Sequence, residues 1–140
     1  MNTRDFGKLG EKYAARYLED GGCHIIGMNV FVRHCEIDII ADDGITLIFA
    51  EVKTRRQYPG VMNDFGTPAE AVDLRKQDCL IRAAEEYLLT NPTDRFTRID
   101  VIEVYADPTC DSFVPLGLNH IRNAVRKTGK FSRTAQKNHD

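Results

Sequence analysis

The sequence predicts a single α/β domain in which helices pack on a mixed sheet. The first observation is the length of 140 residues, which suits one domain. The second is the composition, 42% hydrophobic and 29% charged, which is ordinary for a soluble globular chain. The third is the pattern of two amphipathic helical stretches that alternate with runs of β-branched and apolar residues.

Neither a membrane helix nor an export signal is expected. The longest apolar run is far below the ~20 residues that a membrane helix needs. The charged first residues lack the apolar core of a secretory signal. We therefore expect a cytoplasmic protein with no membrane partner.

The first half of the chain predicts one helix and three strands. Apolar residues recur at helical spacing from Phe6 to Leu18, so we expect a helix over residues 3–20, capped by Thr3 and ended by two glycines. The expected strands are residues 24–33, bent at Gly27 and Asn29, then residues 35–41, then residues 45–54. An Asp-Gly turn within residues 42–44 joins the last two strands as a hairpin.

The second half predicts one more helix and one or two more strands. The expected segments are a loop over 55–66, a capping box over 67–70, a helix over 74–89, a strand over 98–105, a short strand over 113–118 and a turn or helix over 120–125. The element order α-β-β-β-α-β-(β) is typical of helices packed on a mixed sheet.

The charge is distributed unevenly along the chain. The net charge is −2, yet residues 120–140 hold six Lys or Arg and a single acid, Asp140. We expect a domain over residues 1–126 and a basic, disordered tail over residues 127–140. The tail suggests a polyanionic partner, and the alternative interpretation is a solvated chain terminus.

The four cysteines show no metal-binding or redox spacing. Cys23, Cys35, Cys79 and Cys110 contain no CxxC pair, so a zinc site is not expected. We expect reduced thiols, mostly small apolar core residues.

Charged residues interrupt two of the predicted strands. Alternate side chains of a strand share a face, so Glu36 and Asp38 point the same way, as do Glu51 and Lys53. If the hairpin places these strands side by side, Asp38, Glu51 and Lys53 converge. Two carboxylates on rigid strands suit Mg²⁺, and a nearby ammonium stabilises charge on a reacting phosphate.

The alternative interpretation is a structural ion pair without catalysis. In that case Lys53 neutralises Asp38 or Glu51, because a charged side chain in an apolar strand is costly unless it is paired. Buried ion pairs contribute little net stability. This slightly favours a functional role for these charged residues over a purely structural one.

These residues also carry a resemblance to a known family. The segments that carry it are Gly10-Glu11, Glu36-Ile37-Asp38, residues 49–55, Lys76 and residues 98–101. Over about residues 4–125 the chain resembles the YraN-like family, which is similar to archaeal Holliday-junction resolvases and to restriction-endonuclease-like PD-(D/E)xK nucleases. Cys35 replaces the usual glycine before Glu36, and Ile99 replaces the usual aromatic residue before Asp100.

The resemblance implies a fold and a site. The fold is a restriction-endonuclease-like α/β/α core with a central mixed sheet of about five strands. The implied metal ligands are Asp38, Glu51, the Val52 carbonyl and, as an accessory ligand, Glu11. Lys53 is the implied residue that orients or activates the attacking water, and Glu36 is a supporting carboxylate.

The resemblance also implies contacts with nucleic acid. Arg55, Arg56, Lys76 and the basic tail are the expected phosphate contacts. The alternatives are an exposed loop pair for the two arginines and a surface helix lysine for Lys76. For Glu11 the alternative is a solvated helix face.

The expected function is a Mg²⁺- or Mn²⁺-dependent nuclease that hydrolyses phosphodiester bonds in DNA, with branched or damaged DNA as candidate substrates and a homodimer as a candidate assembly. The second hypothesis is a non-catalytic nucleic-acid-binding or scaffold protein that keeps the nuclease fold. The third is a structural ion-pair core with no role on nucleic acid.

Overall fold

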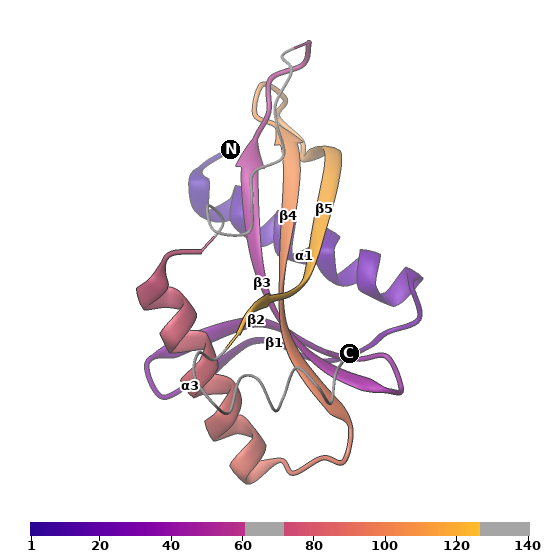
Figure 1. Cartoon of the computed structure of the whole chain (residues 1–140). Helices are drawn as coiled ribbons and strands as arrows, with labels where there is room; N and C mark the ends of the chain where they lie inside the picture. Colours follow the sequence, from indigo (N-terminus) through magenta and orange to yellow (C-terminus); the bar gives the residue numbers. More distant parts are fainter. Residues whose placement is uncertain (61–71, 127–140) are drawn as a thin grey trace.

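The structure, a computed structural model, describes residues 1–60 and 72–126. Its elements are α1 (Thr3–Asp20), β1 (His24–Val32), β2 (Cys35–Asp42), β3 (Thr46–Arg56), α3 (Leu74–Thr90), β4 (Phe96–Asp107) and β5 (Val114–Val125). The strands form one sheet in the order β1-β2-β3-β4-β5 (Figure 1). The predicted α/β class and mixed sheet of five strands are confirmed.

The strand directions explain the connections. β1, β2 and β3 form an antiparallel meander, and β5 is antiparallel to β4. β3 and β4 are parallel, so the chain must cross over between them, and α3 lies in that crossover. Among the described residues, no helix combines the length and the apolar character that a membrane span requires.

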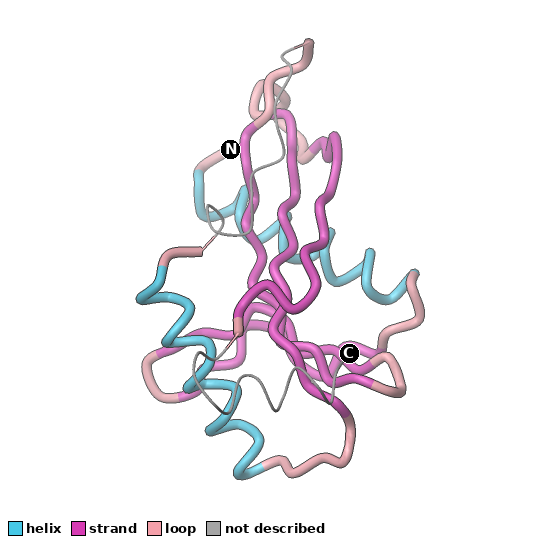
Figure 2. Tube along the Cα trace, in the orientation of Figure 1, coloured by secondary structure: helices cyan, strands magenta, loops and turns pink. Residues whose placement is uncertain are grey.

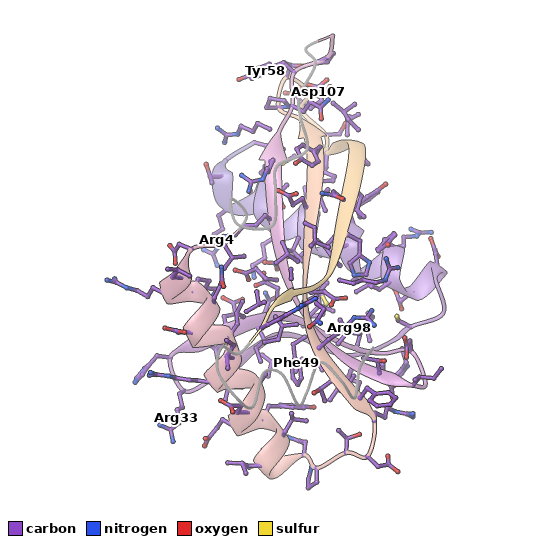
Figure 3. All side chains as sticks on the ribbon, in the orientation of Figure 1. Arg4, Arg33, Phe49, Tyr58, Arg98 and Asp107 are labelled. Atoms are coloured by element: carbon purple, nitrogen blue, oxygen red, sulfur yellow. A yellow bond between two sulfur atoms is a disulfide. The ribbon has the colours of Figure 1, made fainter. Side chains whose placement is uncertain are left out.

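The two helices cover opposite faces of the sheet. Alternation along β3 directs Ile48 and Ala50 toward α1, whereas Leu47 and Phe49 face α3. Figure 2 shows the helices on either side of the twisted strands, and Figure 3 shows Phe49 between the sheet and α3. Each face therefore has its own apolar core, as an α/β/α arrangement requires.

Several predicted boundaries change in the structure. The helix over residues 3–20 is confirmed, but its N-cap is Asn2, whose side chain accepts a hydrogen bond from the Asp5 N–H at 2.8 Å. The expected strand over residues 113–118 is confirmed as β5 but is longer than predicted, and the expected closing turn or helix over 120–125 is wrong, because pairing with β4 continues through Val125. The end of the expected loop over 55–66, the expected capping box over 67–70 and the expected disordered tail over 127–140 lie outside the described residues.

The expected loop begins later than predicted. Arg55 and Arg56 belong to β3, because their backbone pairs with Tyr105 and Ala106 of β4. The sequence places Pro59 and Gly60 shortly after them, but the partner strand extends the ladder to Arg56.

The cysteines also differ from the prediction. Cys35 on β2 and Cys79 on α3 form a disulfide with a Cα–Cα distance of 5.8 Å, whereas Cys23 and Cys110 are free. The two half-cystines are separated by 44 residues in sequence. Their pairing follows from the packing of α3 on the sheet, which the spacing of the cysteines does not reveal.

Gly10 allows α1 to approach β3 closely. A Cβ atom at this position would lie 2.8 Å from the Thr54 Cβ and would overlap the Thr54 hydroxyl. Gly7, one turn earlier, has nothing within 4 Å of the corresponding position. The contact at Gly10 therefore sets the height of α1 above the sheet, and with it the height of Glu11.

We expect Gly10→Ala to destabilise the fold despite the better helix propensity of alanine. Overpacking of this kind costs about 1–3 kcal/mol, whereas alanine in place of glycine gains about 1 kcal/mol in an exposed helix. Urea unfolding measures the difference, and Gly7→Ala is the matched control, expected to be neutral or stabilising. Equal effects of the two substitutions would contradict the close contact.

Candidate active site

The register of β2 and β3 brings two carboxylates together. The last pairs between these strands are Ile40↔Phe49 and Ile39↔Ala50, so one further step places Asp38 opposite Glu51. At this step the N–H of Val52 donates to Asp38 Oδ2 at 2.9 Å. The side chain of Asp38 thus takes the backbone donor where the two strands separate, and it points toward Glu51 as predicted.

Two lysines flank Glu51. Lys53 Nζ and Lys76 Nζ each lie 3.8 Å from Glu51 Oε2. The Glu51 side chain is only 4% exposed, whereas those of Lys53 and Lys76 are 40% and 32% exposed. Both lysine side chains are therefore partly open to solvent, unlike the partners of an enclosed structural ion pair. The α3 lysine, which sequence alone could not separate from a surface residue, belongs to this group.

A second carboxylate group adjoins the first through Asp38. One oxygen from each of Glu11, Glu36 and Asp38 lies within 4.8 Å of the others. The Glu11 side chain is only 15% exposed, so the alternative of a solvated helix face is wrong. Glu36, expected only as a supporting carboxylate, belongs to this group as well.

Asn29 and Lys8 complete this group and were not predicted. The Asn29 amide donates to Glu11 Oε1 at 2.9 Å and to Glu36 Oε1 at 2.6 Å. Lys8 Nζ lies 3.6 Å from Glu11 and 4.0 Å from Glu36. Asn29 has a left-handed backbone with φ of 51° inside β1. An asparagine in a β-branched run signals this backbone irregularity, but the sequence does not show where its amide points.

The electrostatics of the site disfavour further negative charge. Burial, together with the adjacent Glu51 carboxyl, raises the pKa of Asp38 to about 8, although the Val52 N–H acts against it. Burial also raises the pKa of Glu11, and Asn29 and Lys8 partly offset this. Four carboxylates packed at this density require protons, amines or a cation.

The cationic residues of β3 lie on both faces of the sheet. Arg55 Nε donates to the buried Glu103 at 2.7 Å on the face that also carries Lys53. Arg56 lies on the opposite face, where it donates to Thr3 at 3.2 Å and stacks over Phe6 at 5.6 Å. The two arginines are therefore strand residues with defined partners, and the alternative of an exposed loop pair is wrong.

An open hollow adjoins the carboxylates. It has a volume of about 530 Å³ and lies between the start of α1 and β3. Its lining residues are Thr3, Phe6, Gly7, Glu11, Val52, Lys53, Thr54, Arg55 and Arg56. The hollow therefore connects the acidic residue of α1 with both arginines and leaves room for a ligand beside Lys53.

The donor set suits a hard divalent cation. Carboxylate oxygens are the ligands that Mg²⁺ and Mn²⁺ prefer. The group of Glu11, Glu36 and Asp38 offers oxygen ligands and includes neither a cysteine nor a histidine. Asp38 stands between Glu51 and this group, so it would be the shared ligand. Participation of the Val52 carbonyl stays a prediction.

Asp38 makes stability depend on pH in a defined direction. The pKa of about 8 in the folded protein lies above the ordinary value of 3.8 for an aspartate, so folding favours the protonated form. The resulting contribution of Asp38 to the free energy of unfolding is complete below pH ~4 and is lost as the pH rises through ~8. The total loss is on the order of a few kcal/mol. We expect Asp38→Asn to lack this loss.

Urea unfolding at pH 5 and pH 8 in chelator measures the effect. The wild type should lose stability relative to Asp38→Asn at the higher pH, and the exposed Asp111→Asn should follow the wild type. Parallel pH profiles for wild type and Asp38→Asn would contradict the assigned environment.

Comparison with known proteins places the chain in a family. Residues 10–104 match the uncharacterised protein family UPF0102. A UPF0102 protein of Caldanaerobacter subterraneus subsp. tengcongensis is 37% identical over 125 residues, 89% of this chain and 97% of that protein. One of Chlorobium chlorochromatii is 39% identical over 124 residues, 88% and 92% of the two chains, and one of Symbiobacterium thermophilum is 44% identical over 107 residues, 76% and 86%. The similarity extends over most of the chain in each case, and the chain belongs to the UPF0102, or YraN-like, family.

Proposed function

We propose that the chain is a Mg²⁺- or Mn²⁺-dependent nuclease that hydrolyses phosphodiester bonds in DNA. The observation that carries the proposal is the convergence of Asp38 and Glu51 at the point where β2 and β3 separate, with Lys53 3.8 Å from Glu51. The resemblance to restriction-endonuclease-like nucleases supports the same assignment for these three residues.

Each residue has a distinct role in this proposal. Asp38, Glu51 and Glu11 would hold the cation, with the Val52 carbonyl to complete its ligands and Glu36 as a supporting carboxylate beside Glu11. A bound divalent cation would supply Lewis acidity, which polarises the phosphate and lowers the pKa of a water molecule. Lys53 is half exposed beside Glu51, so its ammonium would orient the attacking water and stabilise negative charge on the phosphate.

The hollow next to the carboxylates suggests the path of the DNA backbone. Lys53 and both arginines of β3 line it, so phosphates that follow it would meet positive charge. Branched and damaged DNA are the proposed substrates by resemblance alone. To cut a DNA junction in two strands of opposite direction, an enzyme needs two active sites. For a junction substrate we therefore propose that two chains bind together as a homodimer. Sedimentation of the protein–DNA complex would measure the number of chains bound.

Cleavage of a labelled substrate panel tests the activity. The panel contains single-stranded, duplex, flap and four-way-junction DNA and RNA, each with Mg²⁺ or Mn²⁺. We expect metal-dependent cutting of DNA that falls at least 100-fold in Glu51→Gln, because one ligand of the cation is lost. Glu19→Gln is the control, since Glu19 is an exposed glutamate near the end of α1 and does not line the hollow.

The other outcomes assign the alternatives. Equal cutting by wild type and Glu51→Gln would mean a contaminating nuclease and would overturn the proposal. Absence of cutting with salt-sensitive DNA binding that survives Glu51→Gln would identify a non-catalytic binding or scaffold protein.

Asn29 is expected to hold Glu11 and Glu36 for the cation. Asn29→Gly removes the amide but tolerates the left-handed backbone, so it isolates the two hydrogen bonds. We expect Mn²⁺ affinity, measured by calorimetry, to fall about 10-fold or more, as for other residues that orient metal ligands. Asn123→Gly is the control, because Asn123 also has positive φ (54°) but lies on β5. Unchanged Mn²⁺ affinity in Asn29→Gly would exclude this role.

A further inference from the structure

The disulfide lies beside a second hollow, on the α3 face of the molecule. This hollow has a volume of about 740 Å³, within the ~300–1,000 Å³ range of small-molecule sites. Cys35 and Cys79 both line it, between the turn that joins β1 to β2 and residues 75–89 of α3. It is separate from the hollow that adjoins Lys53, with which it shares no lining residue.

The two half-cystines differ in exposure. Cys35 is 4% exposed within the core, whereas Cys79 on α3 is partly exposed. Arg75 and Arg82 line the hollow with Arg33, which lies 3.5 Å from Glu86. Asp78 and Glu85 line it as well, so the charges are mixed. The greater exposure of Cys79 means that a thiolate entering the hollow would reach Cys79 before Cys35.

The disulfide also fixes the part of α3 that reaches the carboxylates. Lys76 lies one turn before Cys79, on the same side of the helix, and its ammonium contacts Glu51 at 3.8 Å. The side chains that α3 buries are Leu80, Ala83 and Ala84, all of which follow Cys79. Among the described residues 72–78, which precede Cys79, Val72 is the one that is buried in the core. The covalent link is thus a principal anchor of the first turns of α3.

We propose that Cys35–Cys79 is a reversible thiol-exchange site for a low-molecular-weight thiol, and that its state controls the position of Lys76 at Glu51. The thiolate attacks the Cys79 sulfur, the S–S bond breaks, and Cys35 leaves as a thiolate that takes a proton from water. A second thiol attacks the mixed disulfide and releases the Cys79 thiol together with the oxidised, dimeric form of the small thiol. Two thiols are oxidised as the protein disulfide is reduced. Only the consequence at Glu51 rests on the proposed function.

Glutathione is the probe, and the full chain with Cys23→Ser and Cys110→Ser is the background. Samples are equilibrated at graded ratios of reduced to oxidised glutathione, quenched with acid, alkylated and analysed by mass spectrometry. We expect both remaining thiols to appear in one transition, and the trapped mixed disulfide to lie on Cys79. In the single-cysteine controls, Cys35→Ser should become glutathionylated at Cys79, while Cys79→Ser should stay unmodified.

Two further readouts follow the structural consequence. Reduction should lower the melting temperature by about 5–10 °C, because the disulfide closes a long loop. Hydrogen exchange should accelerate over residues 74–79, while residues 80–90 keep their protection. Cys79→Ser should match the reduced protein in both measurements and should not respond to glutathione.

Three results would overturn the proposal. They are free thiols at Cys35 and Cys79 in fully oxidised glutathione, a disulfide that persists in fully reduced glutathione, and unchanged exchange over residues 74–79 after reduction. None of these measurements requires DNA cleavage. Failure of the nuclease proposal would therefore leave them interpretable, and failure here would leave the assignment of Asp38 and Glu51 intact.

Discussion

The separation of β2 from β3 at Asp38 is the constraint on which the site depends. Up to Ile39↔Ala50 the two strands exchange backbone hydrogen bonds, and at the next step the Asp38 carboxylate accepts the Val52 N–H instead. A buried backbone donor would be costly without a partner. The carboxylate satisfies it, and the opening between the strands leaves space where Glu51 and the α1 residue Glu11 approach Asp38.

The carboxylates are held together by contacts from every surrounding element. α1 supplies Glu11 and lies close to β3 because Gly10 has no side chain. β1 supplies the amide that bridges Glu11 and Glu36, and α3 supplies a lysine beside Glu51. Repulsion between the acids is therefore opposed by the packing of the whole fold. Such tension between local charge and overall stability is typical of a functional site.

A second buried polar network shows a different balance. Asp100 is fully buried, and its carboxylate accepts hydrogen bonds from Arg98 at 2.9 Å and from the Asn123 N–H at 2.9 Å, and it lies 2.7 Å from His120 Nε2. Burial alone would raise the pKa of Asp100, but His120, Arg98 and the Asn123 N–H together lower it. Three donor groups surround this aspartate, whereas Asp38 accepts from the Val52 N–H and lies beside other carboxyl groups. The two environments separate a structural carboxylate from a candidate ligand.

The sequence predicted most of the framework because its signals are local. Helical spacing located α1 and α3, and β-branched runs with an Asp-Gly turn located the β2–β3 hairpin. The hairpin register in turn predicted that Asp38, Glu51 and Lys53 meet. The end of β3, the continuity of β5 and the cap at Asn2 were missed, because each depends on a hydrogen-bond partner that the local pattern does not specify.

Local sequence patterns identify the charged residues and show which of them share a face of a strand, because alternation along a strand needs no distant partner. The contacts of these residues follow from how the elements pack: Asn29 with Glu11 and Glu36, Lys76 with Glu51, Arg56 with Phe6, and Cys35 with Cys79. The physical reason is range. Secondary structure follows from neighbours within a few residues, whereas these contacts join segments whose separation is set by sheet twist and by the depth at which each helix packs.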